Sequence, residues 1–159
     1  MELHRHISRL VRYNGWANDH ILAKAVTILP ELPVFGETYG VLPDELLHIL
    51  QSEQHWLSVW RGELVRETVN PSQSQLIAAY ATTQGELEAF VESLDESDLA
   101  RVVTRVGRAH QVSAPLGDFI SHLVSHGTYH RGEIALLLTQ AGASPGDIDF
   151  YDFLLAGAP

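Results

Sequence analysis

Apolar residues recur every three or four positions along most of this chain, and that spacing constrains the fold more than any other feature. The period is that of an amphipathic helix with one face turned toward a core. In residues 2–28 it is carried by Leu3, Ile7, Leu10, Val11, Asn14, Ala17, Ile21 and Ala25. Pro30 and Pro33 stop this first predicted helix, and a loop containing Gly and Pro follows through Gly40.

Two further helices are predicted after that loop. Pro43 suits the first turn of the second helix, which continues to about Trp60 and ends at Gly62. The third helix begins at Asn70-Pro71-Ser72 and carries apolar residues at helical spacing, with an acidic face that we expect to be solvated.

The period changes in residues 101–112, where apolar and polar residues alternate around Gly107-Arg108. This alternation, with a glycine in the middle, predicts a short hairpin. Pro115 then begins a fourth helix that runs to about Ala141. A last turn or two, in residues 149–155, is expected to pack back on the body of the molecule.

Four long helices and one hairpin predict an all-α fold, namely an antiparallel four-helix bundle with the small hairpin before its fourth helix. A length of 159 residues fits a single domain, residues 1–159. The formal charge of −10 argues against nucleic acid or an anionic membrane as the main partner, because phosphate binding needs a basic surface. No leader or membrane-spanning segment is visible, so we expect a soluble, cytoplasmic protein.

Histidine is the notable polar residue, since the chain has nine histidines and no cysteine. On the predicted fourth helix His122, His126 and His130 stand at positions i, i+4 and i+8. An i, i+4 pair can place two imidazoles on one metal ion, whereas the outer two residues are ~12 Å apart along the axis. His130 lies in the middle of the apolar face and His122 at its edge, which favours the pair His126 and His130. Histidines on a core face are also commonly structural, so the pair alone does not establish a metal site.

A third ligand has to come from another helix. The second helix offers His48 and His55, which lie ~10.5 Å apart along the axis, so at most one of them can join a shared ion. Both stand on a polar strip outside the apolar sector of that helix. Periodicity does not choose between them.

Gly127 and Gly132 lie beside the histidine pair on the fourth helix. Each costs ~1 kcal/mol relative to Ala inside a helix. The two positions therefore predict that a neighbouring element approaches the backbone closely there, which packing alone would explain.

Three motifs resemble those of one known family. Tyr13-Asn14-Gly15-Trp16-Ala17-Asn18 resembles the Y-N-x-W-A-N signature of the DinB family, also described as DinB/YfiT-like. Leu47-His48-Ile49, with Trp56 eight residues after the histidine, resembles its second-helix motif. Residues 122–134 resemble its H-x-x-x-H-x-x-Y-H-R-G-x-I motif. The motifs occur in the family's order and at its separations, and the resemblance covers nearly the whole chain.

The resemblance implies an antiparallel four-helix bundle, often a homodimer, that holds a divalent metal ion through three histidines. Carried over position by position, these ligands are His48, His126 and His130. Zn or Ni is the expected metal, with Fe, Mn or Cu as alternatives. His122 then has a supporting or packing role, and His55 has no counterpart in the motifs.

Three neutral imidazoles leave coordination positions open, as in a catalytic site, and a metal there lowers the pKa of a bound thiol or water. The resemblance implies activation of a low-molecular-weight thiol for transfer to a small-molecule substrate, or of water for hydrolysis, and we favour the thiol. Glu133 lies near the ligand face and is the candidate general base, although a helix Glu paired with a neighbouring Arg is the simpler interpretation. The alternatives are a non-catalytic, metal-binding stress or damage-inducible protein, and a structural bundle with vestigial histidines.

The remaining charged residues of interest have simpler interpretations. Arg131 points away from the ligand face of the fourth helix, so we expect it to anchor a neighbouring helix or the chain ends. His4 and His6 are expected on the surface without a role, and His20 and His110 are expected to be incidental.

Overall fold

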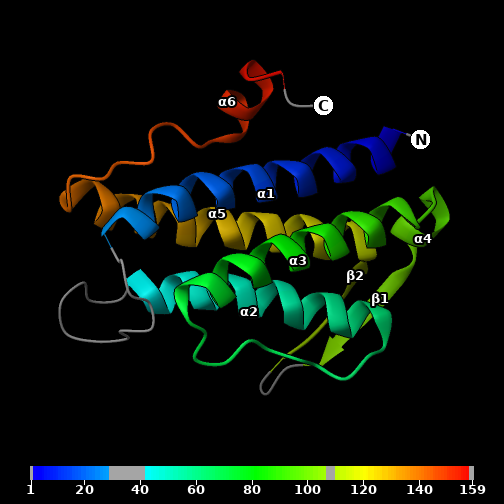
Figure 1. The fold of residues 1–159 in the computed structure, drawn as a ribbon. Coiled ribbons are helices and arrows are strands. Elements are labelled where there is room, and N and C mark those ends of the chain that lie inside the picture. Colours follow the sequence, from blue (N-terminus) through cyan, green and yellow to red (C-terminus); the bar gives the residue numbers. More distant parts are fainter. Residues whose placement is uncertain (1, 29–41, 107–109, 158–159) are drawn as a thin grey trace.

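The computed structural model describes residues 2–28, 42–106 and 110–157. Six helices and one antiparallel hairpin make up this described part (Figure 1). The helices are α1 (Glu2–Ile28), α2 (Leu42–Arg61), α3 (Gln73–Glu92), α4 (Glu96–Ala100), α5 (Leu116–Gln140) and α6 (Phe150–Leu155), and the strands are β1 (Val102–Val106) and β2 (Gln111–Pro115). The mainly helical fold with a hairpin before the last long helix is confirmed. The loop expected through Gly40 and the hairpin turn at Gly107-Arg108 lie outside the described residues.

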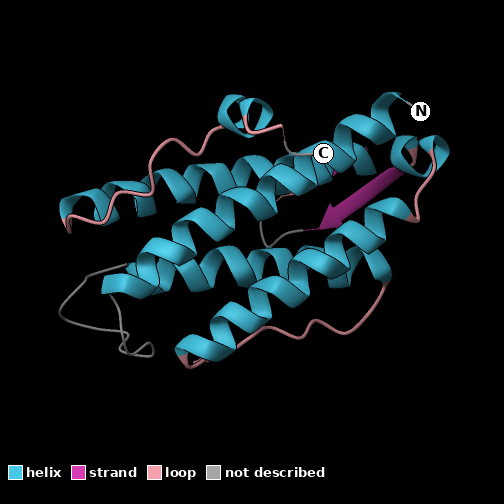
Figure 2. Cartoon of the chain, turned by 45° about the horizontal axis from the view of Figure 1, so that its top comes forward, coloured by secondary structure: helices cyan, strands magenta, loops and turns pink. Residues whose placement is uncertain are grey.

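The four long helices run side by side along most of the molecule (Figures 1 and 2). Helices α1 and α2 each pack against both α3 and α5. Two clusters of buried apolar side chains fill the space between the helices, one around Leu46 and Ile134 and the other around Leu87 and Ile120. Within the described ranges, no helix is both long enough and apolar enough to cross a membrane.

The helix ends follow from local signals in the sequence. Ser72 caps α3, since its hydroxyl accepts a hydrogen bond from the Gln75 amide and the Gln75 side chain accepts one from the Ser72 amide. Gly62 and Gly142 follow α2 and α5 with φ of 69° and 79°, a backbone conformation that glycine adopts without strain. The short helix α4 was not predicted, although Asp95 caps it through the amides of residues 97 and 98.

The predicted hairpin is confirmed and extends slightly further than the alternating pattern. Val103 pairs with Ala114, and Arg105 pairs with Val112. Strand β2 runs to Pro115, and α5 begins at the next residue. The Leu116 amide donates to the Arg101 carbonyl at 3.0 Å, so the two ends of the hairpin meet where α5 starts.

The C-terminal helix α6 packs back on α1, as the sequence predicts. Phe153 is buried and makes edge contacts with the rings of Tyr13 and Trp16. The Tyr13 hydroxyl donates to the Ile148 carbonyl at 3.1 Å. The segment that leads from α5 to α6 is therefore tied to the middle of α1.

A buried network of charged and amide groups joins α1, α2 and α5. Arg131 of α5 is 1% exposed, and its Nη1 donates to the Oδ1 atoms of Asn14 and Asn18 at 2.8 and 2.9 Å. The Nδ2 atoms of the same two asparagines donate to Glu53 Oε1 of α2, at 2.6 and 2.9 Å. Arg131 also lies over the ring of Tyr13. The prediction that Arg131 anchors a neighbouring helix is confirmed, whereas its buried acidic counterpart Glu53 was not predicted.

The two glycines beside the histidines of α5 differ in their surroundings. A Cβ added at Gly127 would lie 2.8 Å from Arg131 Nη1 and 3.0 Å from Asn14 Oδ1. A Cβ added at Gly132 would meet no described atom within 4 Å. The expected close approach is therefore correct at Gly127 and wrong at Gly132, where the side chain would project into open space.

This difference predicts opposite effects of the same substitution. Gly132→Ala is expected to raise the free energy of unfolding by about 0.5–1 kcal/mol, because alanine favours the helix and nothing opposes its methyl group. Gly127→Ala is expected to lower it by about 1–3 kcal/mol, because the methyl group displaces the buried guanidinium. Urea unfolding of the two variants measures both effects, and an equal gain in stability at both positions would contradict the network.

Candidate metal site

His48 of α2 and the pair His126 and His130 of α5 come together where these two helices pack. One ring nitrogen from each lies within 4.8 Å of those of the other two. The Nε2 atoms of His48 and His126 are 3.1 Å apart. The ring centroid of His130 is 4.5 Å from each of the other two. The side chains that the motifs single out are therefore neighbours in space.

The cluster opens toward solvent on the α2 side. His48 is exposed, whereas His126 and His130 are half-buried. Burial, and then the neighbouring rings of His130, His48 and His122, lower the pKa of His126 to about 4. His126 is therefore neutral at physiological pH, which is the protonation state that a metal ligand requires.

A carboxylate stands directly behind His130. Glu45 of α2 has its Oε2 2.5 Å from His130 Nδ1, so this nitrogen carries a proton that the carboxylate accepts. The other ring nitrogen, Nε2, is left free for the cluster. The sequence motifs do not include Glu45. The missed signal is its place three residues before His48, on the same side of the helix.

Glu133 lies on the same side of His130 as Glu45. Its Oε2 is 3.4 Å from His130 Nδ1, and a hydrogen bond from the Tyr129 hydroxyl to Glu133 raises the pKa of that tyrosine. The simpler interpretation, in which Glu133 pairs with an arginine, is wrong for the described residues. Glu133 instead belongs to the polar shell around the outer edge of His130.

A second set of groups could also hold a metal ion, formed by Glu45, His130 and Glu133. Both carboxylates of this set approach Nδ1 of His130. The 2.5 Å separation of this nitrogen from Glu45 is that of a strong hydrogen bond. This geometry favours Glu45 as the group that orients His130.

Ser52 is a further neighbour of the cluster that the sequence motifs do not include. Its hydroxyl oxygen is 3.3 Å from His126 Nε2, and it lies one helical turn after His48. His48 and Ser52 are spaced i, i+4 on α2, and both side chains thus lie against Nε2 of His126 on α5. The serine borders the open side of the cluster.

The donor geometry fits one small divalent ion. Three imidazole nitrogens bound at about 2.05 Å in a tetrahedral arrangement lie about 3.3 Å from one another. The 3.1 Å between the Nε2 atoms of His48 and His126 is close to this value, and a ring nitrogen of His130 lies within 4.8 Å of the other two. The residues present could therefore hold a zinc-like ion with at least one position open to solvent.

The other two candidates on these helices lie outside the cluster. His122 is exposed, with its ring 5.9 Å from His126 and 6.0 Å from Trp56. His55 instead accepts a hydrogen bond on Nε2 from Arg105 at 2.9 Å. The structure therefore separates His48 from His55, which periodicity had left open.

One of the histidines expected to be incidental has a clear packing role. His4 is half-buried, and its Nε2 is 3.0 Å from the Val91 carbonyl of α3, so the expectation of a surface residue without a role is wrong. His20 contacts the Trp16 carbonyl within its own helix, and His6 and His110 are exposed. None of these side chains is near the candidate site.

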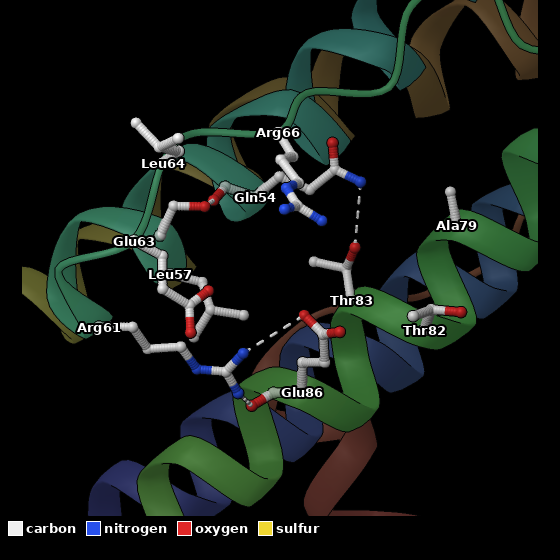
Figure 3. Close-up of a pocket in the computed structure, with 11 residues that line it drawn as sticks. Gln54, Leu57, Arg61, Glu63, Leu64, Arg66, Ala79, Thr82, Thr83 and Glu86 are labelled. Carbon is white, nitrogen blue, oxygen red and sulfur yellow. Dashed lines mark hydrogen bonds and ion pairs between the residues drawn. The ribbon is translucent and has the colours of Figure 1, made fainter.

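A large cavity of the described structure lies away from the histidine cluster. Figure 3 shows this cavity of about 660 Å³ between α2, the segment after it and α3. Arg61 at its edge is held by the carboxylate and the carbonyl of Glu86, at 3.5 and 3.0 Å. The cavity shares no residue with the histidine cluster, so its size does not identify it with the candidate metal site.

Comparison with known proteins agrees with the resemblance. The family model of the DinB family matches residues 2–157. The chain is also similar to a curated protein named Protein DinB from Bacillus subtilis (strain 168), at 27% identity over 165 residues. That match covers 92% of this chain and 93% of the relative, so the similarity extends over both proteins almost completely.

Proposed function

The chain belongs to the DinB family, and from that premise we propose that it is an enzyme whose divalent metal ion is held by His48, His126 and His130. The observation that carries the proposal is the convergence of three imidazole nitrogens from two helices, with a carboxylate orienting one of them. The reaction we propose is the activation of a low-molecular-weight thiol for transfer to a small electrophile. The metal is Zn or Ni, which imidazole ligands suit.

The surrounding residues have distinct roles in this proposal. A bound divalent ion would supply a Lewis acid that favours the deprotonated form of a thiol or of water. Glu45 holds the proton on Nδ1 of His130 and fixes the orientation of that ring. His48 and Ser52 border the open side, where a substrate can enter. Because the chain has no cysteine, the reacting sulfur has to arrive with the substrate.

The helix packing supports a finer description of the architecture. Each of the long helices α1 and α2 packs against both α3 and α5, as expected of an antiparallel four-helix bundle. The family match from residue 2 to residue 157 supports a single domain. We propose this architecture as the frame that brings α2 and α5 together at the histidines.

A conjugation assay tests the proposed reaction. Protein stripped with a chelator and reloaded with Zn or Ni is incubated with glutathione and chlorodinitrobenzene, and the coloured thioether is followed by absorbance. We expect product formation that requires the metal and is lost in His126→Ala. Metal-dependent hydrolysis of a small ester without thioether formation would instead favour activation of water. Tight metal binding without turnover of either kind would favour the non-catalytic metal-binding protein.

The role of Glu45 gives a separate prediction. Glu45→Gln removes the negative charge that orients and polarises His130, and loss of such a partner weakens metal binding by about 10–100-fold. We expect that decrease in a competition titration against a chromophoric chelator. Asp44→Asn is the matched control, since Asp44 is the exposed acidic residue immediately before Glu45. An equal decrease in the control would mean that general negative charge, and not contact with His130, is responsible.

A further inference from the structure

A second, smaller pocket lies next to the candidate metal site. It has a volume of about 420 Å³ and is formed where the hairpin covers α2 and the first turns of α5. Trp56 and Phe119 form its aromatic walls, with ring centroids 5.4 Å apart. Val112 and Ala114 of β2 close it from the hairpin side. The walls are mainly apolar, which suits a flat organic molecule better than a hydrated ion.

His122 connects this pocket to the histidine cluster. The residue lines the pocket, and its ring centroid lies 5.9 Å from that of His126. His122 and His126 are one helical turn apart on α5, which is about 6 Å along the axis. A molecule bound against Trp56 therefore has its nearer end within one turn of the candidate metal ligands.

The charged groups of the pocket are Arg105 of β1 and Asp118 of α5. The Arg105 guanidinium lies 5.6 Å from the centre of the Trp56 ring, and its Nη2 donates to His55 at 2.9 Å. These two contacts hold the Arg105 guanidinium against the pocket wall. Its other N–H groups donate no hydrogen bond to a described residue and can bind an anion. Asp118 is exposed in the first turn of α5, where solvent screens its charge.

We propose that this pocket binds the substrate and selects small molecules that combine a flat apolar body with one anionic group, the body against Trp56 and Phe119 and the anion on Arg105. The inference rests on the proposed function, since a metal ion held at His126 would supply the chemistry for which the pocket holds the substrate. The binding preference itself depends only on the residues of the pocket. It can therefore be measured in metal-free protein.

Two fluorescent dyes with similar aromatic bodies test the preference in the full-length protein. Anilinonaphthalenesulfonate carries one negative charge, and phenylnaphthylamine is neutral. We expect Arg105→Gln to lower the affinity for the anionic dye by about tenfold or more, which is the effect of losing a charge-assisted hydrogen bond. The affinity for the neutral dye should not change. Arg66→Gln is the matched control, because Arg66 is an exposed arginine that lines the separate cavity of Figure 3. It is expected to change neither affinity.

Two further variants make the test specific to this pocket. Ala114→Trp fills the pocket and is expected to weaken binding of both dyes, whereas Asp118→Asn removes only a solvent-screened charge and is expected to leave both dye affinities nearly unchanged. In the conjugation assay the anionic dye is expected to compete with the electrophile. Unchanged dye affinities in Arg105→Gln and Ala114→Trp would overturn the inference. Failure of wild-type protein to bind metal would overturn the proposed function alone, because the dye affinities are measured without metal.

Discussion

The His48→Ala variant is expected to lose its divalent metal ion, whereas the His55→Ala variant keeps it. Both histidines lie on α2 seven residues apart, yet only His48 faces His126, at 3.1 Å between their Nε2 atoms. His55 is held by Arg105 on another part of the helix. Loss of a direct ligand should weaken binding by more than the about 10–100-fold that loss of a supporting group costs. Metal analysis of proteins purified without a histidine tag measures the effect.

Two variants of α5 provide an internal comparison. His126→Ala should lose the metal, and His122→Ala, one turn away, should retain it. If His48→Ala kept its metal while Glu133→Gln lost it, the ion would be held by the set of Glu45, His130 and Glu133. That outcome would overturn the assignment of the three histidines.

The Arg131→Met variant is expected to lose about 3–5 kcal/mol of folding free energy, the usual cost of leaving a buried charge without its counter-charge. Arg131 is 1% exposed, and Glu53 across the network is 2% exposed. Removal of the Arg131 guanidinium leaves the Oδ1 atoms of Asn14 and Asn18 without their described donor. It also leaves the buried Glu53 carboxylate without the positive charge of Arg131. Urea unfolding followed by circular dichroism measures the loss. Arg66→Met, at an exposed arginine, should change stability by less than about 0.5 kcal/mol.

The pH dependence of this loss identifies its cause. Burial raises the pKa of Glu53, and the charge of Arg131 lowers it, so the substitution raises it further. A carboxyl group whose pKa is higher in the folded than in the unfolded state costs stability as pH rises above about 4.3, its unfolded value. The destabilisation should therefore be larger at neutral pH than in mild acid. Adding Glu53→Gln should recover part of the loss at neutral pH, and no recovery would contradict the described network.

The helices and their ends were predictable because their causes are local. Pro43, Ser72 and Gly62 mark ends through backbone geometry and capping, and these effects act within a few residues of the sequence. The hairpin was predictable for the same reason, from the alternation in residues 101–112. The short helix α4 was not predictable from apolar periodicity, which five residues cannot display, and its signal in the sequence is the capping pattern at Asp95.

The polar contacts between helices, at the candidate site and in the buried network, were not predictable from periodicity. Glu45 contacts a histidine 85 residues away, and Glu53 meets asparagines 39 and 35 residues away. Such contacts depend on how the helices are rotated against one another, which a single helix pattern does not determine. The same limit left His48 and His55 equivalent until a family motif, and then the packing of α2 on α5, distinguished them.

The hairpin has a consequence for how proteins of this design can diversify. The two ends of the hairpin are joined by the hydrogen bond from the Leu116 amide to the Arg101 carbonyl. Each doubling of the number of residues between these ends therefore adds only ~0.6 kcal/mol of loop-closure entropy. The hairpin supplies Arg105, Val112 and Ala114 to the pocket but none of the three candidate ligands. Substitutions in the hairpin can therefore change the lining of the pocket without changing any of the three candidate ligands. The proposed ligand preference and the proposed metal binding can then be altered independently of each other.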